Sequence, residues 1–231
     1  FRVPSLLMQV EVQEDASVHI TYDITFANNE GAHPIDVVDI GVPHSNYDIS
    51  NMSASIGGAA LTDIRQSQYV TPGVEVHLNS HAIPPGGEGT LHFEFSMPDM
   101  VYQDTTRPDY ASLQITPTWF GNEYVTGTTD IRIAIFMLPG VEAEDVLFQE
   151  IPFSIKTVSE GRTVVGWRWP EARATGAHLM GVSFPKTGLT RVVRISRFEM
   201  IVRSFTENEN ARLAAAAFAI LLLGMLFFRF T

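Results

Sequence analysis

The segment SVHITYDITF, residues 17–26, decides the fold class of this chain. Apolar side chains occupy every second position of the segment: Val18, Ile20, Tyr22, Ile24 and Phe26. Successive side chains of a β-strand point to opposite faces, so this spacing gives one apolar and one polar face. We therefore predict that the segment is a half-buried strand of a sheet.

Similar alternating runs, separated by turn residues, extend on both sides of this segment over residues 5–97. They are SLLMQVEVQE before it and IDVVDIGVP, ISNMSASIGG, ALTDIRQSQ, VEVHLN and GTLHFEFSM after it. About seven short strands without a helical period are typical of an antiparallel β-sandwich. The turn-rich segment PDMVYQDTTRP interrupts the pattern, and a second set of strands follows it. The fold expected is mostly β, with two Ig-like antiparallel β-sandwich domains over residues 1–98 and 99–206 and one C-terminal transmembrane helix.

The third expected segment, residues 207–231, is a polar hinge followed by that helix. The run LAAAAFAILLLGMLFF, residues 213–228, contains no polar side chain and is bracketed by Arg212 and Arg229. At 1.5 Å per residue a helix of this run spans about 24 Å, close to the ~30 Å hydrocarbon core of a bilayer. Small residues at Ala215, Ala219 and Gly224 would let another membrane helix pack closely against it.

These features predict a single-pass protein of the cell membrane. The numbering begins at Phe1 and not at methionine, which favours a removed signal peptide. We expect extracytoplasmic N-terminal domains, either periplasmic or at the cell surface, and a cytoplasmic C-terminus. A tail-anchored protein with a cytosolic domain is the alternative.

Charge and composition exclude several classes of function. The chain has 15 basic and 26 acidic residues, a net charge of −11 that argues against nucleic-acid binding. Residues 1–110 hold 15 acidic and three basic residues, so the N-terminal domain is the acidic one. Its acidity predicts a solvated surface, a cation site or a basic partner. The absence of cysteine excludes disulfides, thiolate metal ligands and a thiol nucleophile.

Three acidic residues suggest one metal site. Asp99, Asp104 and Asp109 follow one another at five-residue spacing in the turn-rich segment. Calcium prefers oxygen ligands from such loops. The alternative is that each aspartate supports a turn.

Histidines and aromatic residues suggest further sites. His77 and His92 lie on the two arms of an expected hairpin around residues 83–88, where they could face each other, with His81 and Glu94 nearby. Solvent-facing histidines are the alternative to a metal site. The pairs Trp119-Phe120 and Trp167/Trp169 could form a sugar-stacking platform, a partner interface or part of the core, and core packing is favoured.

Several stretches resemble a bacterial family of membrane-anchored proteins with an uncharacterised exported β-sandwich domain. They are DASVHITYDITF (15–26), TWFGNEYVTGTTDIRIAIFMLPG (118–140), GRTVVGWRWP (161–170) and MGVSFPK (180–186), and the resemblance covers most of residues 10–188. It implies export and membrane anchoring. The family has no assigned catalytic residues to carry over.

The sequence contains no G-x-S-x-G motif of serine hydrolases, no P-loop, no Rossmann fingerprint and no H-E-x-x-H motif of metallopeptidases. We therefore expect a non-catalytic membrane protein without a cofactor, acting as an accessory subunit of a membrane complex or as a surface interaction module. Its partners would be the lipid bilayer and other membrane-protein subunits. The alternatives are a calcium- or glycan-binding surface module and, less favoured, a hydrolase on a β scaffold.

Overall fold

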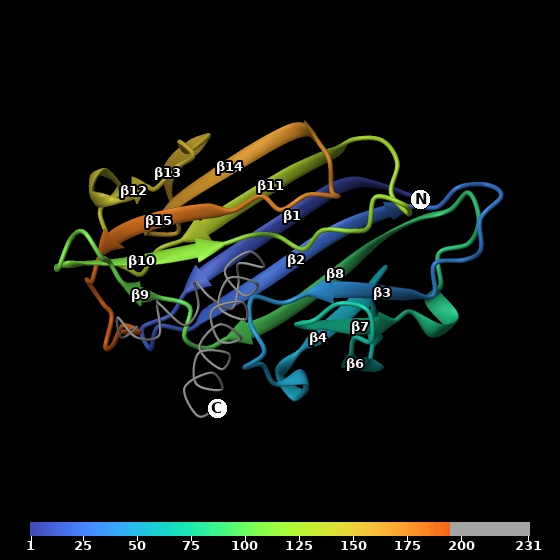
Figure 1. Ribbon diagram of the computed structural model, residues 1–231, viewed down its shortest axis with the longest axis horizontal. Helices are drawn as coiled ribbons and strands as arrows, with labels where there is room; N and C mark the ends of the chain where they lie inside the picture. The colour runs from blue at the N-terminus through green and yellow to red at the C-terminus, as the bar shows by residue number, and fades with distance from the viewer. Residues whose placement is uncertain (195–231) are drawn as a thin grey trace, which may run out of the picture. The chain divides into compact units, whose positions relative to one another are not determined.

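The computed structural model describes residues 1–194, and this part of the chain is mostly β-strand. Its largest sheet has eight strands in the order β13-β14-β11-β1-β2-β8-β4-β5 (Figure 1). Their bounds are Ile155–Ser159, Arg162–Ala172, Thr129–Phe136, Arg2–Val12, Val18–Ala27, Glu88–Met97, Ser53–Ile56 and Ala59–Leu61. Neighbouring strands are antiparallel except β1 and β11, which are parallel.

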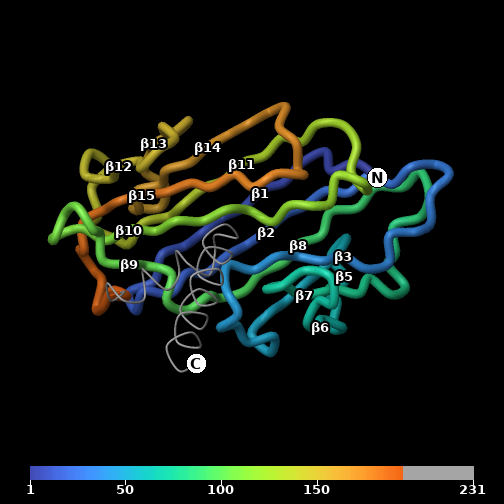
Figure 2. The backbone as a smooth tube through the Cα atoms, in the orientation of Figure 1, coloured from blue at the N-terminus to red at the C-terminus, as the bar shows by residue number. Residues whose placement is uncertain are grey.

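Two smaller sheets accompany the large one. The first has the order β12-β15-β10-β9, with bounds Leu147–Phe148, Met180–Pro185, Tyr110–Ile115 and Tyr102–Gln103. The second has the order β3-β7-β6, with bounds Val37–Gly41, Gly73–His77 and Ile64–Gln66. Three short 3₁₀ helices lie in connections, η1 at Ile49–Asn51, η2 at Asn79–His81 and η3 at Ala143–Asp145. Figure 2 shows the long central strands running diagonally, with β10 and β15 over one part and β3, β6 and β7 over another.

The alternation of apolar residues predicts the buried face of the large sheet correctly. All five apolar residues of the segment 17–26 are at most 2% exposed in β2. The even-numbered residues of β1 from Leu6 to Val12 are buried on the same side, as the register Leu6↔Ile24 requires. Side chains of all three sheets join them in one continuous core. The smaller sheets therefore cover the apolar face of the large one.

Two turns follow the residues that the sequence offers. Between β1 and β2, the Asp15 carboxylate accepts hydrogen bonds from the backbone nitrogen and the hydroxyl of Ser17, at 3.0 and 2.6 Å. Between β13 and β14, Glu160 and Gly161 both have positive φ, 52° and 74°. Two such residues form the hairpin turn whose twist matches that of the flanking strands.

The division into two sandwich domains at residue 98 is wrong. β1 pairs with β11 over seven residue pairs, from Ser5↔Asp130 to Glu11↔Phe136. The large sheet thus takes strands from both sides of the expected boundary, and residues 1–193 form one compact unit. The alternation in a strand fixes which face is buried, but it does not specify the neighbouring strand. The buried residues on both sides of the expected boundary therefore belong to one continuous core.

The hairpin expected around residues 83–88 is also wrong. β7 pairs with β3 and β6, whereas β8 pairs with β2 and β4, so the two arms belong to different sheets. His77 contacts the Glu75 carboxylate at 3.0 Å, and His92 contacts that of Asp23 at 2.8 Å. The two histidines have separate partners and do not form the expected pair.

Within residues 1–194, no helix is long and apolar enough to cross a membrane. The expected hinge and transmembrane helix over 207–231, with Ala215, Ala219 and Gly224, lie outside the described residues.

Candidate functional site

Exposed aromatic side chains gather at one cavity of about 540 Å³, which we call the aromatic pocket. Four aromatic residues are exposed in residues 1–194, and three of them line this pocket: Tyr69 (86% exposed), Trp119 (50%) and Tyr124 (63%). Phe1, Phe26 and Phe120 form an apolar part of the wall together with residues of β3. The volume is within the usual range for small-molecule pockets.

A short turn between β6 and β7 positions Tyr69. The buried hydroxyl of Ser67 accepts hydrogen bonds from the backbone nitrogens of Tyr69 and Val70, at 3.1 and 2.9 Å. The same hydroxyl donates to the Asp39 carboxylate on β3. The turn is therefore fixed to the strand that forms one wall, and the phenol of Tyr69 is left exposed.

Hydrogen bonds to the core position Trp119 and Phe120 in the loop between β10 and β11. The buried phenol of Tyr22 accepts from the backbone nitrogen of Thr118 at 3.1 Å, and the Thr118 hydroxyl accepts from that of Gly41 at 3.0 Å. The backbone N–H of Phe120 donates a hydrogen bond to Ala174 O at 2.8 Å. The ring of Phe120 meets that of Phe26 edge-on at 5.5 Å, and both rings line the pocket.

The same loop continues through a tight turn that presents Glu123 and Tyr124. Tyr124 donates its backbone nitrogen to Gly121 O at 3.1 Å, and Val125 is buried directly after it. Thr126 donates to Phe1 O at 3.0 Å, which attaches the loop to the start of β1. The turn thus has a fixed base, while the side chains at its tip remain exposed.

The polar groups of the aromatic pocket are largely unused by the protein. Within residues 1–194, the Glu123 carboxylate, the Trp119 indole nitrogen and the phenol oxygens of Tyr69 and Tyr124 have no hydrogen-bond or ion-pair partner. The lining contains the carboxylates Asp39 and Glu123 and no lysine, arginine or histidine, and its one cationic group is the Phe1 ammonium, which donates to Tyr124 O at 3.0 Å. The pocket therefore combines an aromatic surface with negatively charged carboxylates and with polar groups that have no partner among the described residues.

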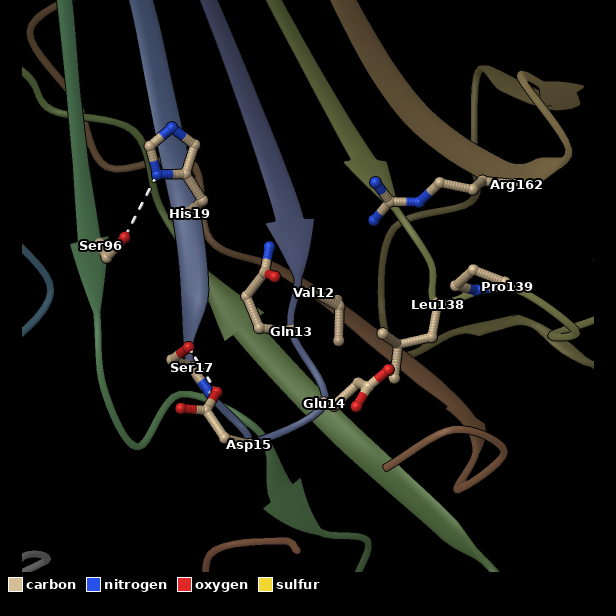
Figure 3. A pocket seen from close by; sticks show the side chains of 10 residues that line it. All are labelled: Val12, Gln13, Glu14, Asp15, Ser17, His19, Ser96, Leu138, Pro139 and Arg162. Carbon is tan, nitrogen blue, oxygen red and sulfur yellow. Dashed lines mark hydrogen bonds between the residues drawn. The ribbon is translucent and has the colours of Figure 1, made fainter. Parts of the chain in front are cut away.

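A second, polar pocket of about 700 Å³ lies at the turn between β1 and β2 (Figure 3). Ser17 and Asp15 bond to each other there, His19 contacts Ser96, and Arg162 donates to Glu11 at 2.8 Å. Hydrogen bonds from Ser17 lower the pKa of the Asp15 carboxyl. Most of its polar groups are therefore already paired, in contrast to those of the aromatic pocket.

At this second pocket, the side chain of His19 contacts both a serine and a carboxylate. The Nδ1 atom of His19 is 3.2 Å from Ser96 Oγ, and its Nε2 atom is 3.6 Å from the Glu94 carboxylate. His19 and Ser96 are directly opposed in the register of β2 and β8, so strand pairing alone brings them together. Glu94 also accepts from the Ser53 hydroxyl at 2.7 Å, which lowers its pKa. The arrangement is a hydrogen-bond network across strands.

The three aspartates expected to bind calcium do not form one site. Asp99 pairs with Arg191 at 2.7 Å, and Asp109 is exposed. Asp104 is buried and accepts from Ser183 Oγ at 2.7 Å, from both Thr106 donors at 2.8 Å and from the Arg107 nitrogen at 2.9 Å. Burial alone would raise its pKa, but these hydrogen bonds outweigh it and lower the pKa to about 2. No group of three His, Asp or Glu residues within 1–194 is placed to hold a metal ion.

The tryptophans divide between the core and the surface. Trp167 is 2% exposed and donates its indole nitrogen to Ile151 O at 2.9 Å, so the core position favoured from the sequence is confirmed. Trp169 is partly buried beside the His178 ring, whereas Trp119 is in the aromatic pocket. Sequence reasoning missed Tyr69 and Tyr124. Tyr69 lies in a loop far from Trp119 in the sequence, and Tyr124 lies near Trp119 but outside an alternating run.

Comparisons with known proteins give weak likenesses of fold. No family model and no curated protein matches the chain. An M1 zinc metallopeptidase from Deinococcus radiodurans has a TM-score of 0.49 at 11% identity, covering 80% of this chain and 42% of the peptidase. A candidate nutrient-binding protein from Legionella pneumophila has a TM-score of 0.48 at 12% identity, covering 91% of this chain and 73% of that protein. This chain thus spans less than half the length of the peptidase, and neither likeness carries an argument about activity.

Proposed function

We propose that this chain is a non-catalytic binding module, an accessory subunit of a membrane complex or a surface interaction module, that recognises its partner through the aromatic pocket. The observation that carries the proposal is the gathering of three exposed aromatic side chains around one cavity. Exposed tyrosine and tryptophan are costly to leave in water and are enriched in binding sites.

The free polar groups of the pocket support the same proposal. A buried polar group that loses its hydrogen bonds on binding opposes association. The indole and phenol groups of Trp119, Tyr69 and Tyr124 have no internal partner to lose. A ligand can therefore bond to them without first breaking contacts within the protein, unlike a ligand of the polar pocket.

The proposed place of this module is the outer side of a cell membrane. The support is the apolar run 213–228 and the resemblance to exported, membrane-anchored proteins. An anchored module needs only a recognition surface to act as an accessory subunit. The core below the pocket, which continues through all three sheets, supplies a fixed base for such a surface.

The test is the native mass of the full chain after extraction in a mild detergent. Wild type should be recovered in a stoichiometric assembly, and the variant Trp119→Ala should be recovered without its partner. Phe148→Ala is the matched control, because Phe148 is similarly exposed, at 47%, and lies outside the pocket. The control should retain the assembly. An assembly that survives Trp119→Ala, or an extracted wild type without any partner, would contradict the proposal.

A further inference from the structure

We infer that the aromatic pocket binds a cationic side chain, an arginine or lysine within a basic segment of a polypeptide partner. This inference rests on the proposed function and adds the chemistry of the ligand. It goes beyond a general apolar contact because two independent features of the lining, its rings and its charge, favour the same kind of group.

The rings supply the first feature. A guanidinium or ammonium group is attracted to the face of an aromatic ring, most strongly to that of tryptophan and also to that of tyrosine. Trp119, Tyr69 and Tyr124 come from two loops and line the same cavity, with half or more of each side chain exposed. A long basic side chain can contact such rings with its methylene groups and its charged end together.

The carboxylates supply the second feature. Glu123 has no basic partner within residues 1–194, whereas Asp130 is bonded to Arg132 and Arg168, and Asp63 is bonded to Arg65. In Asp39, the Ser67 hydroxyl occupies one carboxylate oxygen, Oδ1, and leaves Oδ2 free of hydrogen bonds from the described residues. Two negatively charged carboxylates, each with at least one oxygen that accepts no hydrogen bond from the described residues, are therefore present in the lining.

The surroundings favour the same ligand over the alternatives. The two carboxylates of the lining, Asp39 and Glu123, outnumber its one cationic group, the Phe1 ammonium that donates to Tyr124 O, so the field there disfavours an anionic ligand. The first 110 residues carry a net charge of −12, which attracts a basic segment over a longer range than the pocket itself does. A neutral sugar would use the rings but gain nothing from this charge.

A pair of peptides that differ in one charge tests the inference on the detergent-extracted full chain. The probes are acetyl-Gly-Arg-Gly-amide and its citrulline counterpart, which has nearly the same shape and is neutral, and maltotriose represents a neutral sugar. Binding is measured by calorimetry for wild type, Trp119→Ala, Glu123→Gln and the control Glu144→Gln. Glu144 is exposed and lies outside the pocket.

The arginine peptide should bind about tenfold more tightly than the citrulline peptide, and more weakly as salt is raised. Glu123→Gln should weaken the arginine peptide by about three- to fivefold, and Glu144→Gln should have no effect. Equal affinity for both peptides would overturn the inference of a cationic ligand, and so would binding of maltotriose alone. The proposed function would remain intact in either case if Trp119→Ala abolishes the binding that is observed. Affinities and assembly that are both unaffected by Trp119→Ala would overturn the two together.

Discussion

The phenol oxygen of Tyr22 accepts a hydrogen bond from the backbone nitrogen of Thr118 at 3.1 Å, across 96 residues of sequence. Tyr22 is in the middle of β2 and is 2% exposed, and burial raises its pKa. Thr118 directly precedes Trp119 in the aromatic pocket. One buried hydroxyl of the core thus fixes the loop that presents the main side chain of the candidate site.

Replacing Tyr22 by phenylalanine should therefore affect both stability and the pocket. The change leaves the Thr118 N–H without an acceptor, which should lower the free energy of unfolding by about 1–3 kcal/mol. Chemical denaturation of the detergent-extracted chain measures this loss. Tyr124→Phe removes an exposed hydroxyl instead and should change the free energy by less than about 0.5 kcal/mol. Equal stability of Tyr22→Phe and wild type would show that the bond does not hold the loop.

Asp104 should make stability depend on pH in the acid range. Its pKa in the folded chain, about 2, is below the ordinary value of 3.8. Its contribution, about 2 kcal/mol, is therefore complete above about pH 5 and is lost as the pH falls towards 2. Asp104→Asn should be less stable than wild type by about this amount at pH 7, and the two should converge near pH 2. The exposed Asp109 supplies the control Asp109→Asn, which should change the free energy of unfolding at pH 7 by less than about 0.5 kcal/mol.

Gly166 occupies a position of β14 where a side chain does not fit. A Cβ atom there would lie 2.5 Å from the carbonyl oxygen of Ile133 on the neighbouring β11. Gly166→Ala must push the neighbouring strands β14 and β11 apart and should cost about 1–3 kcal/mol. Gly176→Ala is the matched control, since nothing lies within 4 Å of its Cβ position. Thermal melts of the two variants should differ clearly, and a Gly166→Ala variant as stable as Gly176→Ala would contradict the strand packing.

The two environments of tryptophan should be separable by fluorescence quenching. Trp119 is half exposed, whereas Trp167 is 2% exposed and bonded to Ile151 O. Acrylamide should quench the emission of Trp119 readily, and Trp119→Phe should remove most of the quenchable signal. Trp167→Phe should leave that signal in place. A quenchable fraction that is unchanged in Trp119→Phe would mean that this indole is covered.

The sequence predicts where the strands of this fold lie better than it predicts which strands pair with one another. Alternation is a local property, and it identified the buried face of β2 from Val18 to Phe26 correctly. The parallel pairing of Ser5 with Asp130 joins residues that are distant in the sequence, and no local pattern encodes such a contact. The single core of residues 1–193 was missed for this reason, and two sandwiches were expected in its place.

The candidate site was predicted in part. Trp119 stood out as an aromatic pair with Phe120, but the same pattern at Trp167 marks a core residue. The partners of Trp119 became visible only in three dimensions, because the Ser67 turn and the Thr118 contact bring Tyr69 to the same cavity. Asp104 is the opposite case, a residue that the sequence suggested for a site and the structure does not place in one. Its spacing suggested a calcium ligand, but its carboxylate oxygens accept hydrogen bonds from protein donors.

The parallel pairing of β1 with β11 also sets an order of events as the chain emerges from its N-terminus to its C-terminus. β1 and β2 can pair as soon as both have emerged, but the other edge of β1 stays open until residues 129–136 have been made. Contacts between such distant segments form slowly, and an open strand edge is a template for pairing with another chain. The nascent chain therefore passes through an interval in which its first strand is vulnerable to misassembly, and a chaperone that covers this edge would act during that interval.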